Sequence, residues 1–213
     1  MPRVVDVEER RRELGEAVWR VIRRDGLAEA SVRTVAQEAG LSTGSLRHYF
    51  GTQTELLVFA MRLVMARVEE RVSAVERPTD AREAAGTVLA ELLPLDDERR
   101  AENEVWLAFT AQALVRPELH ALRAEAYTAL WSGCLRWVRR LLPTGTPADE
   151  VELEAHRLFA LLDGLAVHAA VDPVHSSPQR LVDVLGRHLD AIGGRDADRR
   201  RGRNRADGSV TGR

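Results

Sequence analysis

The stretch from residue 31 to residue 50, SVRTVAQEAGLSTGSLRHYF, constrains the fold of this chain most strongly. Ser31 and Ser42 each stand where a hydroxyl can accept an orphan N–H group of a first helical turn. Between them, apolar residues recur at helical spacing as far as Gly40, a residue suited to the left-handed conformation that ends many helices. The stretch therefore predicts two short helices joined by a tight turn.

The second of these helices has two different faces. Leu46 and Phe50 are its only plainly apolar residues, while hydroxyl, guanidinium, imidazole and phenol groups occupy the other side. A helix-turn-helix needs this division, because one helix braces the other, which enters the major groove of DNA. A structural helical hairpin has the same spacing, so the spacing alone leaves both interpretations open.

The wider pattern favours DNA binding. The segment AGLSTGSLRHYFGTQTELL, preceded by SVRTVAQEAG and by a helix ending near Gly26, resembles the N-terminal DNA-binding domain of the TetR family of bacterial transcriptional regulators. The resemblance covers about residues 8–63. It departs at Gln53, where many family members carry a lysine that contacts a backbone phosphate. Gln53 can still donate a hydrogen bond but brings no charge.

DNA contacts are expected from the second helix and from the start of the first. Arg47 has the geometry to pair with guanine through two hydrogen bonds. Arg33 and Thr34, at the start of the bracing helix, are placed for phosphate, which helix N-termini also attract. The predicted DNA-binding residues are Arg33, Thr34, Thr43, Ser45, Arg47, His48, Tyr49 and Gln53.

Composition indicates a globular protein of the reducing cytoplasm. The chain has 213 residues, of which 45% are hydrophobic, enough to fill a core. Its single cysteine, Cys134, excludes an intrachain disulfide framework. The N-terminus has no apolar signal core, and no stretch approaches the roughly 20 apolar residues of a membrane span. We expect a soluble cytoplasmic protein.

The remaining chain reads as amphipathic helices separated by proline and glycine, with no convincing strand. We predict an all-α protein with a three-helix helix-turn-helix DNA-binding domain at 8–52 and a helical ligand-binding and dimerisation domain at 53–192. Residues 193–213 have almost nothing to bury and are predicted to be a disordered tail. Thr146 as N-cap and Pro147 as first helical residue are expected to start the penultimate helix.

A second, looser resemblance covers residues 93–192. WLAF, LLDGLAVHAAVDP and SPQRLVDVL resemble the C-terminal domain of the BetI-like branch of the family. It implies a small-molecule pocket and a dimer interface built from the last two helices. Aromatic and soft side chains suit apolar ligand sites, so the pocket candidates are Trp106, Phe109, Tyr127, Trp131, Cys134 and Phe159. The dimer candidates are Leu161, Leu165, His168, Leu181, Leu185 and Leu189.

Several of these residues have a plainer interpretation. Aromatic residues at helical spacing are more often core than ligand contacts. Cys134 is a redox-sensing thiol in one interpretation and a small buried hydrophobe in the other, which is the commoner case. Asp163 and His168, on the most apolar helix, either orient a ligand or are paired across the dimer interface, and the sequence favours the dimer interface.

No catalytic set is present. The chain has no phosphate loop, HExxH, nucleophile elbow or CxxC, and its six histidines share no metal spacing. We therefore expect neither an enzyme nor a cofactor or metal. The expected protein is a homodimeric regulator, a repressor that binds a palindromic DNA operator and is released by an apolar or amphipathic small molecule. Activation is the alternative to repression, because the sequence does not reveal where the operator lies relative to a promoter.

The alternative is a helical ligand-binding or interaction module without DNA-binding activity. Gln53 supports it, as does the near neutrality of residues 1–50, where nine Arg face eight acidic residues.

Overall fold

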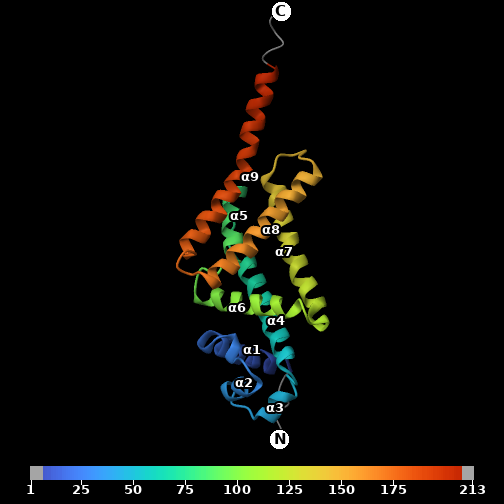
Figure 1. Cartoon of the computed structure of the whole chain (residues 1–213), viewed down its shortest axis with the longest axis vertical. Helices are drawn as coiled ribbons and strands as arrows, with labels where there is room; N and C mark the ends of the chain where they lie inside the picture. The colour runs from blue at the N-terminus through green and yellow to red at the C-terminus, as the bar shows by residue number, and fades with distance from the viewer. Residues whose placement is uncertain (1–6, 208–213) are drawn as a thin grey trace, which may run out of the picture. The chain divides into compact units, whose positions relative to one another are not determined.

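The computed structural model describes the backbone of residues 7–207 and the side chains of residues 10–194. This part of the chain is α-helical with two 3₁₀ turns and no β-strand, which confirms the all-α class (Figure 1). No helix in it is long and apolar enough to cross a bilayer. The elements are α1 (Val7–Asp25), η1 (Leu27–Glu29), α2 (Val32–Glu38), α3 (Thr43–Arg47), α4 (Gln53–Ala74), α5 (Ala81–Ala90), α6 (Asp97–Ala113), η2 (Pro117–Leu119), α7 (His120–Leu141), α8 (Ala148–Val171) and α9 (Pro178–Asp207).

The chain divides into two compact units. The first contains Met1–Ser73 and Asp96–Ala124, and the second contains Ala74–Leu95 and Glu125–Arg213. The helix α6 belongs to the first unit because it packs on α1 and η1. Packing therefore groups α6 with the helix-turn-helix. The domain limits at 8–52 and 53–192 follow expected function, not contacts, and they stay a prediction.

The first unit is built on the apolar face of α1. Leu14, Val18 and Ile22 recur at helical spacing on α1 and are almost completely buried, as their pattern predicts. The helix α1 packs on α2, and α2 packs on α3. After α3, the ring of Phe50 lies 4.8 Å from that of Phe59 on α4. The three helices of the motif are thus fixed by one shared core.

Two ion pairs connect α4 to α6 within the first unit. Arg67 and Arg71, four residues apart on α4, face Glu98 and Glu102, four residues apart on α6. The Arg71 guanidinium donates to both oxygens of the buried Glu102 carboxylate, at 2.9 and 2.6 Å. This two-donor geometry is the strong form of a charged hydrogen bond, so it fixes the register between the two helices.

The second unit packs α9 against α5 and α8. Leu181, Leu185 and Leu189 form the buried face of α9. Arg82 on α5 secures this pair of helices, because its Nε donates to Asp190 at 2.6 Å and its Nη2 donates to the Gly186 carbonyl at 2.9 Å.

Two helix ends differ from the sequence prediction. The helix α8 begins at Ala148, and Pro147 is its N-cap residue. No side-chain hydrogen bond among the described residues caps this end of the helix. Thr146 does not cap α8, because its hydroxyl donates to the Pro143 carbonyl at 2.8 Å and closes the preceding turn instead. The helix α9 runs to Asp207, so residues 193–207 are helical where disorder was expected. A packed helix propagates at one hydrogen bond per added residue. Residues 208–213 lie outside the described chain.

We expect Phe109→Ala to destabilise the protein by about 3–5 kcal/mol, the usual cost of removing a buried aromatic side chain. Phe109 is completely buried on α6. Urea unfolding followed by circular dichroism measures the effect. Leu114→Ala, at a side chain that is 68% exposed, is the control and should change the free energy of unfolding by about 0.5 kcal/mol or less. Equal losses in the two variants would contradict the assignment of Phe109 to the core.

Candidate functional site

The helix-turn-helix is held by local caps. Ser31 accepts the Thr34 N–H at 3.2 Å while its own N–H donates to the Thr34 hydroxyl at 2.9 Å. Gly40, at φ +66°, ends the first helix in the left-handed conformation, and Ser42 accepts the Ser45 N–H at 3.0 Å. The predicted caps at Ser31 and Ser42 and the predicted turn at Gly40 are confirmed. Because Gly40 lacks a side chain, the turn forms without strain.

Charged contacts secure the bracing helix α2 to α1. Glu38 accepts hydrogen bonds from Arg20 at 2.7 Å and from Arg24 at 2.8 Å. These guanidiniums, Arg20 first, hold the pKa of the Glu38 carboxyl below its usual range. Two cations of α1 are thereby neutralised within the protein.

The helix α3 exposes a polar face over a buried apolar one. Leu46 and Phe50 are buried. The predicted DNA-binding residues of this segment are all exposed, and they are Thr43, Ser45, Arg47, His48 and Tyr49.

The helix α3 is shorter than the sequence suggests, since it ends at Arg47. His48 is its C-cap and Tyr49 lies in the turn that follows, because both N–H groups bond back to the last turn of α3. The Ser45 hydroxyl lies 2.8 Å from that of Ser42 and takes part in the cap.

Among the predicted phosphate contacts, Thr34 and Gln53 form hydrogen bonds within the protein, whereas Arg33 forms none with the described residues. The Thr34 hydroxyl donates to the Glu29 carbonyl at 2.7 Å, and the Gln53 side-chain amide donates to the Ala30 carbonyl at 2.6 Å. Both side chains therefore hold the motif together. Arg33 and Arg47 are exposed and form no ion pair with the described residues, so their charges face solvent.

The predicted ligand residues fall into both compact units. Tyr127 and Trp131 on α7 lie 5.6 and 6.1 Å, centroid to centroid, from Phe159 on α8. Trp131 also lies 4.3 Å from the ring of His156. These four residues form an aromatic cluster in the second unit. Trp106 and Phe109, by contrast, belong to α6 in the first unit.

Two titratable groups accompany the aromatic cluster. Burial first, and then the neighbouring Asp163 carboxylate, raise the pKa of the Cys134 thiol to about 12. Burial also raises the pKa of Asp163, which forms no hydrogen bond or ion pair with the described residues. The i, i+4 spacing of Phe159 and Asp163 on α8 places them on one helix face. This spacing is the sequence signal that links Asp163 to the cluster.

The predicted dimer residues differ in how much of each is exposed within a single chain. Leu181, Leu185 and Leu189 are at most 2% exposed within a single chain, and Leu165 is also buried. Leu161 is half-buried and His168 is exposed. Exposed large apolar side chains lie elsewhere on α8 and beyond its end, and they are Leu153, Val167, Val171, Val174 and, on α9, Val182.

Comparison with known proteins places this architecture in a family. Residues 16–58 match the model of the bacterial regulatory proteins of the tetR family, and residues 81–194 match that of the C-terminal domain of BetI-type transcriptional repressors. The HTH-type transcriptional regulator PksA of Bacillus subtilis (strain 168) is 40% identical over 199 residues, which cover 90% of this chain and 94% of PksA. The chain belongs to the TetR family of transcriptional regulators.

Solved structures agree with this family. A transcriptional regulator from Rhodococcus sp. Rha1 has a TM-score of 0.73 at 34% identity, over 85% of this chain and 95% of that protein. A transcriptional regulator from Saccharomonospora viridis, crystallised with choline, has a TM-score of 0.71 at 26% identity, over 87% of this chain and 95% of that protein. Each likeness covers most of this chain and nearly all of the other protein.

Cys134 should be unreactive in the folded protein. At pH 8, a thiol whose pKa is raised to about 12 has almost no thiolate, the form that attacks disulfides. We expect Ellman's reagent to label the native protein many times more slowly than the guanidinium-unfolded chain. The unfolded chain is the internal control. Rapid labelling of the native protein would reopen the redox interpretation of Cys134.

Proposed function

We propose that this protein is a homodimeric repressor that inserts α3 into the major groove of a two-fold-symmetric operator in the bacterial cytoplasm. The observation that carries the proposal is the exposed polar face of α3 above a buried apolar one, with hydroxyl caps at the starts of α2 and α3. A short recognition helix reads only a short half-site, so specificity requires two copies on a palindrome.

The exposed side chains divide into two expected roles. Arg47 is proposed to read guanine, with Thr43 and His48 beside it. Arg33 is proposed to bind phosphate through its unpaired charge, and Tyr49 to contact the sugar–phosphate backbone. Ser45, Thr34 and Gln53 are proposed to act mainly by holding the motif, because their polar groups already bond within the protein.

A dimer interface is proposed on the exposed apolar face that ends α8. Val167 and Val171 stand four residues apart on one face of α8, and His168 lies between them in sequence. Val171 and Val174 are 70% and 83% exposed in a single chain. Burying such side chains against a second copy removes apolar surface from water. Leu181, Leu185 and Leu189 then support the interface from within one chain.

The aromatic cluster between α7 and α8 is the proposed inducer site. Tyr127, Trp131 and Phe159 offer ring faces, and Asp163 offers a carboxylate without a partner among the described residues. Aromatic faces and a carboxylate together attract organic cations. The Saccharomonospora viridis regulator crystallised with choline supports this ligand class. We propose an amphipathic organic cation as inducer, a narrower class than the sequence analysis gives.

Release from DNA then requires a difference in affinity. A ligand shifts a conformational equilibrium only by binding one state more tightly than the other. The inducer must therefore favour the state that does not bind the operator.

A ligand-binding module without DNA binding is the second candidate. It is favoured by the neutralisation of Arg20 and Arg24 by Glu38 and by the structural use of the Gln53 amide. DNase footprinting on the DNA flanking the protein's own gene, at two salt concentrations, separates the two functions. A repressor should protect a palindromic site less well at high salt, because phosphate contacts release counterions. If the protein protected no site in the flanking DNA, and selection from random DNA also yielded no bound sequence, the ligand-binding module would be favoured.

Arg47→Ala should weaken operator binding by about 1–3 kcal/mol, roughly fivefold to 150-fold, and relax specificity at one base pair. Fluorescence anisotropy with a labelled operator measures the affinity. Arg136→Ala is the control because it removes an exposed arginine from α7, in the second unit. Dimerisation should be unaffected in both variants. If Arg47→Ala bound the operator as well as the natural protein does, α3 would not be the reading helix.

Binding of choline-like cations should decline as the pH falls, because protonation removes the Asp163 charge that attracts them. Burial raises the pKa of Asp163, so the decline should begin at a higher pH than for an ordinary aspartate. Asp163→Asn should weaken binding and abolish this pH dependence. Isothermal titration calorimetry between pH 4.5 and 8 measures both effects. A pH dependence that persists in Asp163→Asn would assign it to another group.

A further inference from the structure

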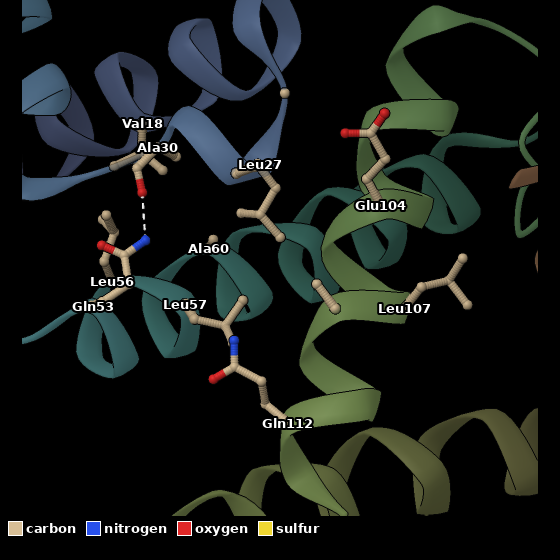
Figure 2. A pocket seen from close by; sticks show the side chains of 13 residues that line it. Val18, Leu27, Ala30, Gln53, Leu56, Leu57, Ala60, Glu104, Leu107 and Gln112 are labelled. Atoms are coloured by element: carbon tan, nitrogen blue, oxygen red, sulfur yellow. Dashed lines mark hydrogen bonds between the residues drawn. The ribbon is translucent and has the colours of Figure 1, made fainter.

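The first unit contains a second candidate ligand site, whose lining includes no residue of the aromatic cluster. It is an open groove of about 510 Å³, lined by residues of α1, α4, α6 and the η1 segment (Figure 2). None of its lining residues is among the pocket candidates of the sequence analysis. The volume falls within the range of about 300–1,000 Å³ that is usual for small-molecule sites.

The walls of the groove are mainly apolar. Leu27 lines it from η1, and Leu56, Leu57 and Ala60 line it from α4. Leu56 and Leu57 are themselves buried, so the walls are firm and already formed. Such walls bind an apolar body of matching size through the area removed from water.

The polar groups of the groove lie along one face of α6. Glu104, Ala108 and Gln112 line the groove at i, i+4, i+8 spacing. At a rise of 1.5 Å per residue, Glu104 and Gln112 stand about 12 Å apart along the helix. Figure 2 shows them toward opposite ends of the groove, with Leu27 and Leu57 between them. The groove thus offers an apolar middle with a different polar group at each end.

The charge of Glu104 selects the ligand class. Its carboxylate is exposed and forms no hydrogen bond or ion pair with the described residues. The Gln112 side-chain amide likewise has no partner among them. A carboxylate repels DNA phosphate and attracts an ammonium group, while an amide accepts or donates a neutral hydrogen bond. Glu104 therefore disfavours a phosphate or an acidic ligand.

We propose that this groove is a second effector site, which binds an elongated amphipathic organic cation. The ammonium group lies at Glu104, the apolar body lies against Leu27, Leu56 and Leu57, and a hydrogen-bonding end lies at Gln112. Because all lining residues belong to the first unit, the site acts on the DNA-binding unit directly.

The position of the groove gives the ligand access to the helix-turn-helix. Ala30 and Gln53, joined by the 2.6 Å hydrogen bond that fixes the start of α4 to the segment before α2, also line it. A molecule in the groove touches this connection. Occupancy is therefore linked to the arrangement of α2 and α3, and any difference in ligand affinity between DNA-binding states changes operator affinity.

Titration calorimetry of the full-length protein with (4-acetamidobenzyl)trimethylammonium tests the site. The comparison ligand is the uncharged analogue in which carbon replaces the quaternary nitrogen. We expect the cation to bind about threefold to fivefold more tightly, the size of effect usual for an exposed charge pair. In an Asp163→Asn background, which weakens binding at the aromatic cluster, Glu104→Gln should make the two affinities equal, whereas Glu69→Gln, at an exposed residue of α4 outside the groove, should preserve the difference.

A tryptophan placed in the groove provides the second variant. In the same Asp163→Asn background, Ala108→Trp should lower affinity for both compounds by about tenfold or more, because its indole occupies the ligand volume. Ala111→Trp, at an exposed position of α6 outside the groove, is the matched control. Circular dichroism melting of all variants checks folding, and Glu104→Gln retains the test if Ala108→Trp unfolds.

Asp163→Asn distinguishes this site from the aromatic cluster. Binding that survives Asp163→Asn but is lost when Ala108→Trp is combined with Asp163→Asn supports the groove. Binding that is lost in Asp163→Asn but survives Ala108→Trp overturns the groove while leaving the proposed inducer site intact. Absence of binding to the natural protein, or equal binding of the two compounds to it, also overturns the proposal.

Discussion

The hydrogen bond from Gln53 to the Ala30 carbonyl ties the two ends of the helix-turn-helix together. It joins the first residue of α4 to the residue that precedes the cap of α2, so α2, α3 and the turn between them are fixed at both ends. Ala30 is completely buried, and a buried carbonyl without a partner costs about 1–3 kcal/mol. The glutamine that appears in the sequence as a weakened phosphate contact is therefore a structural connection.

The pairing of charges decides which arginines are free to act. Glu38 engages two arginines of α1, and two glutamates of α6 engage Arg67 and Arg71 of α4. These pairs position helices and leave the exposed cations Arg33 and Arg47 at the motif. Within residues 1–50, Glu38 offsets the charges of Arg20 and Arg24 inside the fold, while Arg33 and Arg47 stay exposed. The near neutrality of this stretch therefore says little about the charge that the motif presents to DNA.

In the second unit, the carboxylate of Asp163 is partly buried, and this burial disfavours its charged form. Burial raises the pKa of both Asp163 and Cys134, which lie on α8 and α7, the helices that carry the aromatic cluster. An ionisable group that is held against a desolvation cost is a common mark of a binding site. For Cys134 the same burial makes the thiol inert. One physical effect therefore favours a ligand role for the aspartate and a packing role for the cysteine.

The sequence by itself determined the helices, the caps at Ser31 and Ser42, the turn at Gly40 and the family, because these depend on local spacing and local hydrogen bonds. Only the tertiary structure decided which helix faces meet. It directed Leu181, Leu185 and Leu189 into the core of one chain, and it grouped α6, with its buried Phe109, with the first unit. Periodicity shows that a helix has an apolar face, but the partner of that face is fixed by contacts between residues far apart in the chain. The groove beside η1 arises from such contacts. Its lining residues come from four segments between residues 18 and 112, and no local pattern connects these segments.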